Sequence, residues 1–330
     1  MKIALDAMGG DFAPATIVAG AIQAVKEFKD IEITLVGKNE EIEKELLKFK
    51  PVPRSISILH ASEVIEMHEP AAASVRRKKD SSIVKAIGLL ENKTCDAFVS
   101  AGNTGAVVCA ATLNLGLLPG IERPGIAILI PTLKGVSLMI DVGANIDPKP
   151  DHLFQYAVMA NVYFQNVLNK MNPSVGLLNI GEEETKGTDF VKETHKLLSE
   201  KILNFIGNVE GKDIFSGNCD CVICDGFVGN IALKVSESLA ETLSEFLKQE
   251  LTRNIFGKIG ILLLRASLIR FKKKIDYSEY GGAPLLGVDG IVIICHGRSN
   301  VKAIKNAIGA AKKEVERNIN IQIIEEIKRI

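Results

Sequence analysis

The 330-residue chain has no tryptophan, only 4 tyrosines and no net charge, since 40 basic side chains balance 40 acidic ones. Bulk charge therefore gives no reason to expect nucleic-acid binding, and any charged partner has to meet a local patch. No window of about 18 uninterrupted apolar residues is present, so no transmembrane helix is expected. With 47% hydrophobic residues, the chain is long enough to bury a substantial core as a globular protein.

Three common catalytic and nucleotide-binding motifs are also missing. The first predicted strand is followed by Met8, Gly9 and Gly10, and no glycine spacing in the chain fits the dinucleotide fingerprint GxGxxG. The phosphate-binding loop GxxxxGK[ST] and the serine elbow GxSxG are absent as well. We therefore expect no cofactor and no serine nucleophile.

Six cysteines occur in a chain whose first residues do not form a signal peptide, because the apolar run there is short and is interrupted by Asp6. This usage favours reduced thiols and a cytoplasmic location. Cys219, Cys221 and Cys224 have the spacing of a partial metal cluster, but no fourth ligand is near them in sequence. Buried thiols in an apolar strand are the favoured interpretation, and no metal is expected.

Apolar strands alternate with amphipathic helices along the whole chain, which predicts a doubly wound, mostly parallel sheet in a three-layer α/β/α arrangement. No linker, low-complexity tract or repeat interrupts the pattern. We expect a single α/β domain over residues 1–330, with helices predicted at about 14–28, 39–50, 82–92, 106–118, 150–169, 189–203, from 231 to about 252, and from 301 to the C-terminus. Residues 126–131 and 136–142 are predicted to pair as a hairpin.

Six predicted strands end in loops that combine glycine with Asp, Asn or Ser, at residues 6–11, 100–105, 141–145, 179–186, 225–230 and 296–300. Carboxyl ends of parallel strands meet at one edge of a sheet, where ligands bind. Such loops also suit ordinary strand-to-helix connections, and any one of them alone would be read as structural. Together they predict a site in which six loops converge.

The turn at residues 100–105, between a buried strand and an apolar helix, suits an anion because it aims backbone N–H groups and a helix dipole at one point. Amides of Gly229 and Asn230 are a second candidate cradle. Lys186 can reach inward as a point charge, or be a solvated loop lysine. His296 can carry a proton, or be polar surface. The candidate substrate-binding residues are Asp6, Gly9, Gly10, Asp11, Ser100, Gly102, Asn103, Thr104, Gly105, Asp141, Asn145, Asp225 and Gly229.

Residues 251–275 combine seven Lys or Arg residues with many large apolar residues and contain no acidic residue. A basic, apolar segment of this kind predicts a helical protrusion that lies on an anionic membrane. Gly257 and Gly260 are expected to divide it into two helices. Packing against a second copy is the alternative. The predicted membrane-facing residues are Leu262, Leu263, Leu264, Arg265, Lys272 and Lys273.

Several of these stretches together resemble one bacterial enzyme family, the acyl-carrier-protein:phosphate acyltransferases (the PlsX family). The matching stretches span the chain in order and lie at residues 3–11, 73–82, 100–106, 141–145, 175–181, 205–210, 225–230, 277–283 and 296–297. The resemblance implies a fold similar to isocitrate and isopropylmalate dehydrogenases and to phosphotransacetylases. It also implies a homodimer that associates peripherally with membranes.

The activity implied by the resemblance is transfer of a long acyl chain from acyl carrier protein to inorganic phosphate. The acyl phosphate would then serve a glycerol-3-phosphate acyltransferase in phospholipid synthesis. Within this hypothesis Lys186, Asn230 and the amides near Asn103 bind phosphate or the oxyanion, and His296 or Asp225 manages protons. We expect direct attack by phosphate, because no activated serine or cysteine is visible.

Three questions stay open at the level of sequence. The acidic carrier protein has two candidate docking faces, Arg76–Lys79 and residues 265–274. The acyl chain has two candidate grooves, around residues 113–118 and along residues 251–275. The competing functions are a nicotinamide-dependent dehydrogenase on the same fold, which the missing fingerprint disfavours, and a membrane scaffold without activity.

Overall fold

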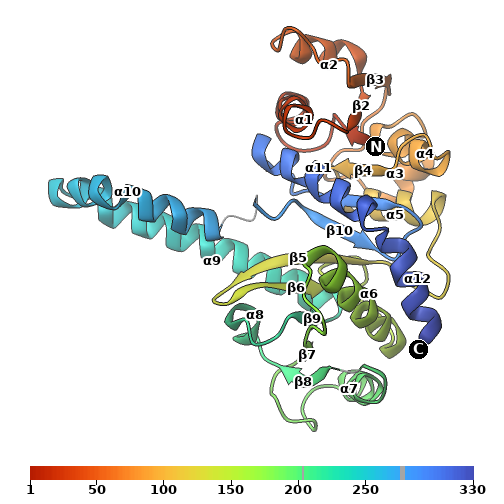
Figure 1. The fold of residues 1–330 in the computed structure, drawn as a ribbon, viewed down its shortest axis with the longest axis vertical. Coiled ribbons are helices and arrows are strands. Elements are labelled where there is room, and N and C mark those ends of the chain that lie inside the picture. Colours follow the sequence, from red (N-terminus) through yellow and green to blue (C-terminus); the bar gives the residue numbers. More distant parts are fainter. Residues whose placement is uncertain (203, 276–278) are drawn as a thin grey trace.

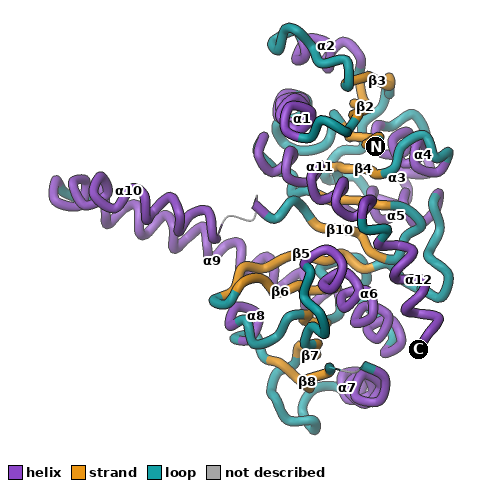
Figure 2. Tube along the Cα trace, in the orientation of Figure 1, coloured by secondary structure: helices purple, strands orange, loops and turns teal. Residues whose placement is uncertain are grey.

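The structure of the chain is a computed structural model, and it describes residues 1–202, 204–275 and 279–330, without the side chains of 272–275. Figure 1 shows a layered body from which one long helical hairpin projects. Figure 2 shows how strands run through the middle of the body while helices lie on either side. Lys272 and Lys273 were predicted to face a membrane, and their side chains lie outside the described part. The same holds for residues 277 and 278 of the matching stretches.

Eleven strands of the described chain form one sheet, in the order β3-β2-β1-β4-β11-β10-β5-β6-β9-β7-β8. They are β1 (Lys2–Asp6), β2 (Glu32–Gly37), β3 (Ile56–His60), β4 (Ala97–Ser100), β5 (Gly125–Thr132), β6 (Gly135–Ile140), β7 (Val175–Leu178), β8 (Phe205–Val209), β9 (Cys221–Ile223), β10 (Ala283–Leu286) and β11 (Ile291–Ile294). The predicted hairpin of β5 and β6 is present, with Ala127 opposite Ile140. The short strand β10 was not predicted.

The sheet consists of two parallel blocks that run in opposite directions. In the first block, β3, β2, β1, β4 and β11 are mutually parallel. In the second, β6, β9, β7 and β8 are parallel. Three antiparallel pairings between the blocks, β11 with β10, β10 with β5 and β5 with β6, reverse the direction. The expectation that six loops share one edge is therefore wrong, because the unpredicted strand β10 turns the second block around.

Helices cover both faces of the sheet, which confirms the three-layer class. They are α1 (Ala15–Glu27), α2 (Asn39–Leu46), α3 (Ala71–Arg77), α4 (Ser82–Glu91), α5 (Thr104–Asn114), α6 (Pro150–Leu168), α7 (Asp189–Lys201), α8 (Asp213–Ser216), α9 (Gly226–Thr252), α10 (Ile255–Ile275), α11 (Val301–Glu316) and α12 (Ile319–Arg329). One hydrophobic core lies beneath α3, α4, α5 and α8 and spans both blocks. On the other face, α1, α2 and α11 cover the first block, and α6, α7 and α12 cover the second.

Strand periodicity explains how the sequence fills the two faces. In β1, Ile3 and Leu5 enter the core beneath α1 and α11, while Ala4 enters the core on the opposite face. Every one of these side chains is fully buried. Because parallel strands inside a three-layer sheet are covered on both sides, they are continuously apolar, and the polar residues are left for the loops at their ends.

Two helical predictions are corrected by the structure. The break predicted at Gly257 and Gly260 is absent, because α10 runs unbroken through both glycines, and the segment 251–275 is divided earlier, between Thr252 and Ile255. Glycine lowers helix stability without forbidding the conformation. The single C-terminal helix predicted for the end of the chain is instead two helices, α11 and α12. They are separated at Asn318, whose φ of +50° is left-handed and ends the first helix.

Candidate active site

The first group of predicted residues follows β1, β4 and β11, which are neighbours in the sheet. Asp6 lies at the end of β1 and is fully buried. Its Oδ2 accepts a hydrogen bond from the Ser100 hydroxyl at 2.7 Å, and its Oδ1 accepts one from the Met8 N–H at 3.1 Å. Ser100 Oγ in turn accepts the Gly102 N–H at 3.0 Å. Burial raises the pKa of Asp6. Asp6 thus links the first loop to the second, and both of its carboxylate oxygens already accept hydrogen bonds from within the protein.

Gly9, Gly10 and Asp11 bring the backbone of this first loop against its neighbours. A Cβ at Gly9 would lie 2.5 Å from both Asp6 Oδ2 and the Gly102 nitrogen, so only glycine fits there. Gly10 has a φ of +96°. The exposed Asp11 donates its backbone N–H to the carbonyl oxygen of Gly297 at 2.8 Å, which joins the first loop to the third.

The turn after β4 offers an anion site at the start of α5. Asn103 caps the helix, because its Oδ1 accepts the Ala106 N–H at 3.0 Å. Its Nδ2 donates to three carbonyl oxygens, of Glu66, Met67 and Glu69, at 3.1–3.2 Å. The N–H groups of Thr104 and Gly105 have no acceptor among the described residues, and both residues are exposed. Fewer backbone N–H groups are therefore available to an anion than expected, since the Gly102 N–H already donates to Ser100 Oγ.

His296 lies in the loop after β11, and its ring is held in one tautomer. The Arg298 N–H donates to its Nδ1 at 3.1 Å, so the neutral ring carries its proton on Nε2. Nε2 faces the Glu237 carboxylate of α9 at 3.9 Å. Both side chains are partly exposed. The histidine is therefore oriented, with its donor nitrogen aimed toward α9.

The second group follows β6, β9 and β7, which are also neighbours. Asp141 is fully buried at the end of β6. Its carboxylate accepts N–H groups from Ile126 at 3.0 Å, Gly143 at 3.1 Å, Ala144 at 3.0 Å and Asn145 at 2.7 Å. The nest of amides at residues 143–145 thus holds an internal carboxylate. Asp141 and the Asn145 backbone shape the loop, and Asn145 Nδ2 donates to Pro124 O at 2.6 Å and to Tyr156 Oη at 2.8 Å.

The start of α9 does not provide the second anion-binding site that was expected at Gly229 and Asn230. Asp225 caps the helix, accepting the N–H groups of Phe227 and Val228 on Oδ1 at 3.0 and 2.9 Å. The Gly229 N–H donates to the Asp225 carbonyl within the helix at 2.9 Å, so it is not available to an oxyanion. Gly229 instead allows close packing, since a Cβ there would lie 1.9 Å from the Asp141 carbonyl oxygen. Asn230 is exposed, and its side chain lies beside Gly143.

Lys186 lies in the loop after β7, the strand that pairs with β9, which leads to Asp225 and Asn230. Its side chain is exposed, and within the described residues its ammonium forms no ion pair. The adjacent Glu182 pairs with Lys212 at 2.9 Å instead. The aliphatic part of Lys186 runs close to Gly181, where a Cβ would lie 3.1 Å from Lys186 Cγ. An exposed, unpaired ammonium can therefore bind an anion in this loop.

Helix α9 connects the two groups of loops. It begins at Gly226 in the second group and passes the first, where Glu237 faces His296 and Glu241 lies 3.7 Å from Arg298. Seven residues separate Asn230 from Glu237, which corresponds to about 10 Å along the helix axis. The first turns of α9 therefore span a distance that a phosphate and a thioester can bridge. The side chain on this span that sequence reasoning missed is Glu237, whose position depends on a contact between distant segments.

Comparison with known proteins adds to this geometry. The profile of fatty acid synthesis proteins matches residues 1–322. The chain belongs to the fatty acid synthesis protein family. A phosphate acyltransferase of Dictyoglomus turgidum is 54% identical, with 100% of this chain and 98% of that protein aligned. The phosphate acyltransferase of Geotalea daltonii is 50% identical over 99% of this chain and 94% of its own. That of Halothermothrix orenii is 47% identical over 100% and 99%.

Solved structures share the fold of this family member. A phosphotransacetylase from Streptococcus pyogenes superposes with a TM-score of 0.63 at 18% identity, covering 99% of this chain and 94% of its own. The EutD phosphotransacetylase from Staphylococcus aureus gives 0.62 at 16% identity, covering 95% and 94%. The expected phosphotransacetylase-like fold is therefore confirmed.

The cysteines of this family member line the core. Cys221 enters the core beneath α6, whereas Cys219 and Cys224 enter the core on the opposite face of the sheet. Burial raises the pKa of the Cys219 thiol to about 12. Cys221 and Cys224 are three residues apart, so strand alternation directs them to opposite faces, and Cys219 precedes the strand. The favoured interpretation as core residues agrees with this placement.

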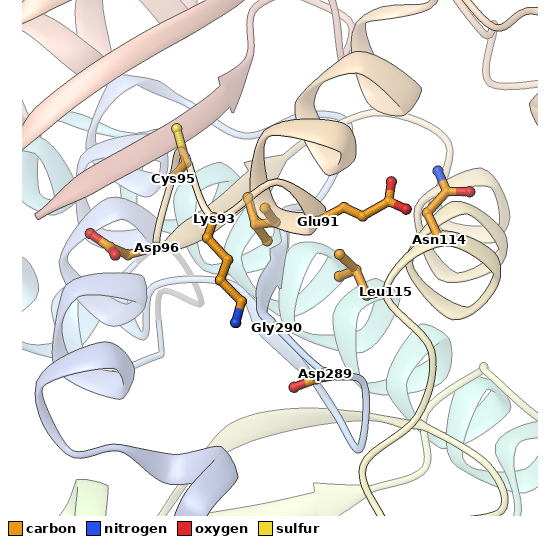
Figure 3. Close-up of a pocket in the computed structure, with 9 residues that line it drawn as sticks. Glu91, Lys93, Cys95, Asp96, Asn114, Leu115, Asp289 and Gly290 are labelled. Carbon is orange, nitrogen blue, oxygen red and sulfur yellow. The ribbon is translucent and has the colours of Figure 1, made fainter.

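A surface pocket lies away from the predicted catalytic and phosphate-binding residues, although Asn114 and Leu115 of its lining belong to the acyl groove expected around residues 113–118. Its volume is about 390 Å³, and Figure 3 shows its lining residues at the ends of α4 and α5 and at the amino ends of β4 and β11. Asp96 and Gly290 directly precede these two strands. Ser100 and His296 of the predicted site lie at the carboxyl ends of the same strands, so the pocket is not part of the site assembled above.

The projecting hairpin of α9 and α10 carries the predicted membrane-facing residues. Leu262, Leu263 and Leu264 have exposed fractions of 70, 79 and 53%, and Arg265 is exposed. Figure 1 shows the two helices side by side, leaving the body together. Among the described residues, no helix is long and apolar enough to cross a membrane.

Proposed function

We propose that this chain transfers a long-chain acyl group from the thioester of acyl carrier protein to inorganic phosphate. The full-length relatives named phosphate acyltransferase support the acyl and phosphate substrates. The observation that carries the residue assignment is the exposed Lys186, which forms no ion pair within the described residues and follows β7, the neighbour of the strand that leads to Asn230. Asn230 in turn lies about two turns along α9 from Glu237, which faces the oriented His296. Acyl phosphate and the free thiol of the carrier are the products.

In this proposal Lys186 and Asn230 bind phosphate, and the N–H groups of Thr104 and Gly105 bind either a phosphate oxygen or the carbonyl oxygen under attack. A phosphate oxygen attacks the thioester carbon, forming a C–O bond as the C–S bond breaks. The electron pair of that bond leaves on sulfur. His296 Nε2–H is oriented to donate a hydrogen bond to the leaving thiolate, which takes its proton from water. Direct attack is favoured because burial raises the pKa of five of the six thiols.

The acidic carrier protein fits the basic surface of Arg76, Arg77 and Lys79. All three residues are exposed, while Lys78 is held by the carboxylate of Glu69 and the carbonyl oxygen of Val64. This surface flanks the predicted anion site, because Asn103 binds the segment 66–69 that leads into α3. The alternative docking face at residues 265–274 lies on the projecting hairpin. We favour the surface at Arg76, Arg77 and Lys79.

The hairpin fits two further partners proposed for this chain, an anionic membrane surface and a second copy. Large apolar side chains are exposed along α9 as well as α10, including Val235, Leu239 and Leu243. Burial of such a surface against an identical hairpin accounts for a homodimer, and the exposed middle of α10 with Leu262 to Arg265 remains for lipid. Peripheral attachment would deliver acyl phosphate to a membrane-bound glycerol-3-phosphate acyltransferase.

Mass-spectrometric detection of acyl phosphate from acyl carrier protein and phosphate tests the proposal. We expect Lys186→Ala and Asn230→Ala to reduce product formation by at least tenfold while the circular dichroism spectrum stays that of the folded protein. Lys192→Ala is the matched control, since Lys192 is an exposed lysine of α7 whose ammonium lies 3.8 Å from Asp189. Normal turnover in both site variants refutes the residue assignment. Absence of acyl phosphate with the wild-type protein refutes the function.

Charge reversal separates the two docking faces. Arg76→Glu with Arg77→Glu is expected to weaken carrier-protein binding and to raise the KM for the acyl carrier protein, without changing the KM for phosphate. Arg265→Glu with Arg270→Glu is the matched pair on the hairpin. If only the second pair weakens binding, the carrier docks on the hairpin.

A further inference from the structure

The loop that carries Lys186 is held by two asparagines from the strands beneath it. Asn179, which follows β7, donates its Nδ2 to the Lys186 carbonyl oxygen at 3.2 Å. Asn208 of β8 donates its Nδ2 to the Glu183 carbonyl oxygen at 2.9 Å. The Lys186 N–H donates to that same oxygen at 3.1 Å. The turn from Glu183 to Lys186 is therefore fixed to the sheet on both sides of the lysine.

Asn208 is placed differently from an ordinary loop asparagine. It pairs with Leu177 inside the sheet and has an exposed fraction of only 6%. Its Oδ1 is the one buried side-chain oxygen or nitrogen, within the described chain, that has no hydrogen-bond partner. A buried acceptor without a donor lowers stability, and a leucine of similar volume would avoid that cost. The amide at this position is thus explained by its donor to Glu183 and not by packing.

We propose that Asn208 is a positioning residue for Lys186: it fixes the backbone turn so that the ammonium is presented to phosphate. The inference rests on the proposed role of Lys186 in phosphate binding. A lysine has a flexible four-carbon stem, so the protein controls its ammonium mainly by fixing the backbone and the first carbons. Asn208 and Asn179 fix the backbone, and Gly181 lies against the stem.

The neighbouring charged residues also leave the Lys186 ammonium available to phosphate. Glu182 and Glu183 precede Lys186 closely, and either carboxylate would compete with phosphate for its ammonium. Lys212 pairs with Glu182 at 2.9 Å and with Glu210 at 3.3 Å. Asn208 fixes Glu183 by its carbonyl oxygen. Loss of the Asn208 donor releases this end of the turn and frees Lys186 to form ion pairs within its own loop.

Asn208→Leu tests the proposal, because it removes the donor and the unpartnered acceptor together at similar volume. We expect the urea midpoint to stay equal or to rise, while kcat/KM for phosphate falls about tenfold, equivalent to about 1.4 kcal/mol. The KM for acyl carrier protein should not change. Asn204→Leu is the matched control. Asn204 directly precedes the same strand, and its Nδ2 donates to the Asn172 carbonyl oxygen at 2.9 Å, away from the lysine loop.

A double-mutant cycle identifies the residue through which Asn208 acts. In a Lys186→Ala background, Asn208→Leu should cause no further loss in kcat/KM for phosphate. Equal losses in both backgrounds, wild-type phosphate kinetics for Asn208→Leu, or parallel losses of stability and of both KM values would each overturn the proposal. Wild-type kinetics of Lys186→Ala alone would instead refute the assignment of Lys186, so the two failures are distinguishable.

Discussion

The buried carboxyl of Glu314 predicts a pH dependence of stability that a single substitution removes. Glu314 lies on α11 with an exposed fraction of 1%, and Tyr163 of α6 donates a hydrogen bond to its Oε1 at 3.2 Å. Burial raises the pKa of Glu314 from 4.5 to about 8, and the hydrogen bond from Tyr163 lowers it in part. The carboxyl is therefore protonated in the folded chain at neutral pH and ionised in the unfolded chain.

The sign and size of the effect follow from these two pKa values. The folded chain binds the proton more tightly, so the contribution of Glu314 is fully present below about pH 4.5 and is lost as the pH rises through about 8. Each pH unit in this window corresponds to about 1.4 kcal/mol for one proton. Between pH 5.5 and 7.5 the free energy of unfolding should therefore fall by about 3 kcal/mol through Glu314 alone.

Glu314→Gln keeps the shape of the side chain and cannot ionise. We expect the difference in free energy of unfolding between this variant and the wild type to change by about 3 kcal/mol between pH 5.5 and 7.5, in favour of the variant at the higher pH. Urea unfolding at fixed protein concentration measures it, since the concentration matters for a protein that associates. Parallel stability curves for the two proteins would show that Glu314 does not titrate in this window and would refute the reasoning.

Three further predictions concern the site and its supports. Gly229→Ala places a Cβ 1.9 Å from the Asp141 carbonyl oxygen and should lower the free energy of unfolding by about 1–3 kcal/mol, whereas Gly260→Ala in α10, where nothing lies within 4 Å, should raise it by up to about 1 kcal/mol. Thermal unfolding distinguishes them, and equal shifts would contradict the packing argument. Asn103→Ala removes the cap of α5 and the amide donor shared by three carbonyl oxygens of residues 66–69, so we expect a loss of about 1–2 kcal/mol together with faster proteolysis in that segment. Asn103→Ser, which keeps a capping oxygen, should recover the cap alone. Leu263→Asp on the exposed middle of α10 should abolish flotation with anionic vesicles and leave acyl-phosphate formation in solution unchanged, and unaltered flotation would remove this part of α10 as the lipid contact.

The sequence predicted the parts of the candidate site that depend on neighbouring residues. The ends of strands and the loops with glycine, Asp and Asn are short-range features, so the loops at 6–11, 100–105 and 296–300 were found in the right places. The hydrogen-bond partners of each polar side chain could not be predicted from the sequence. Asp6 and Asp141 were predicted to contact substrate, and the structure directs their carboxylates to a hydroxyl and to backbone N–H groups within the protein.

Sequence patterns were enough to predict the fold class, the order of most strands and helices, the membership of the family and the basic, apolar helix of the hairpin. These follow from periodicity and from motifs within a few residues of one another. The tertiary structure alone decided that the two parallel blocks run in opposite directions, because that depends on β10 pairing between β11 and β5. It also placed Glu237 opposite His296 and Asn208 beneath the Lys186 loop. Such contacts join residues that are distant in sequence, and only the packed chain brings them together.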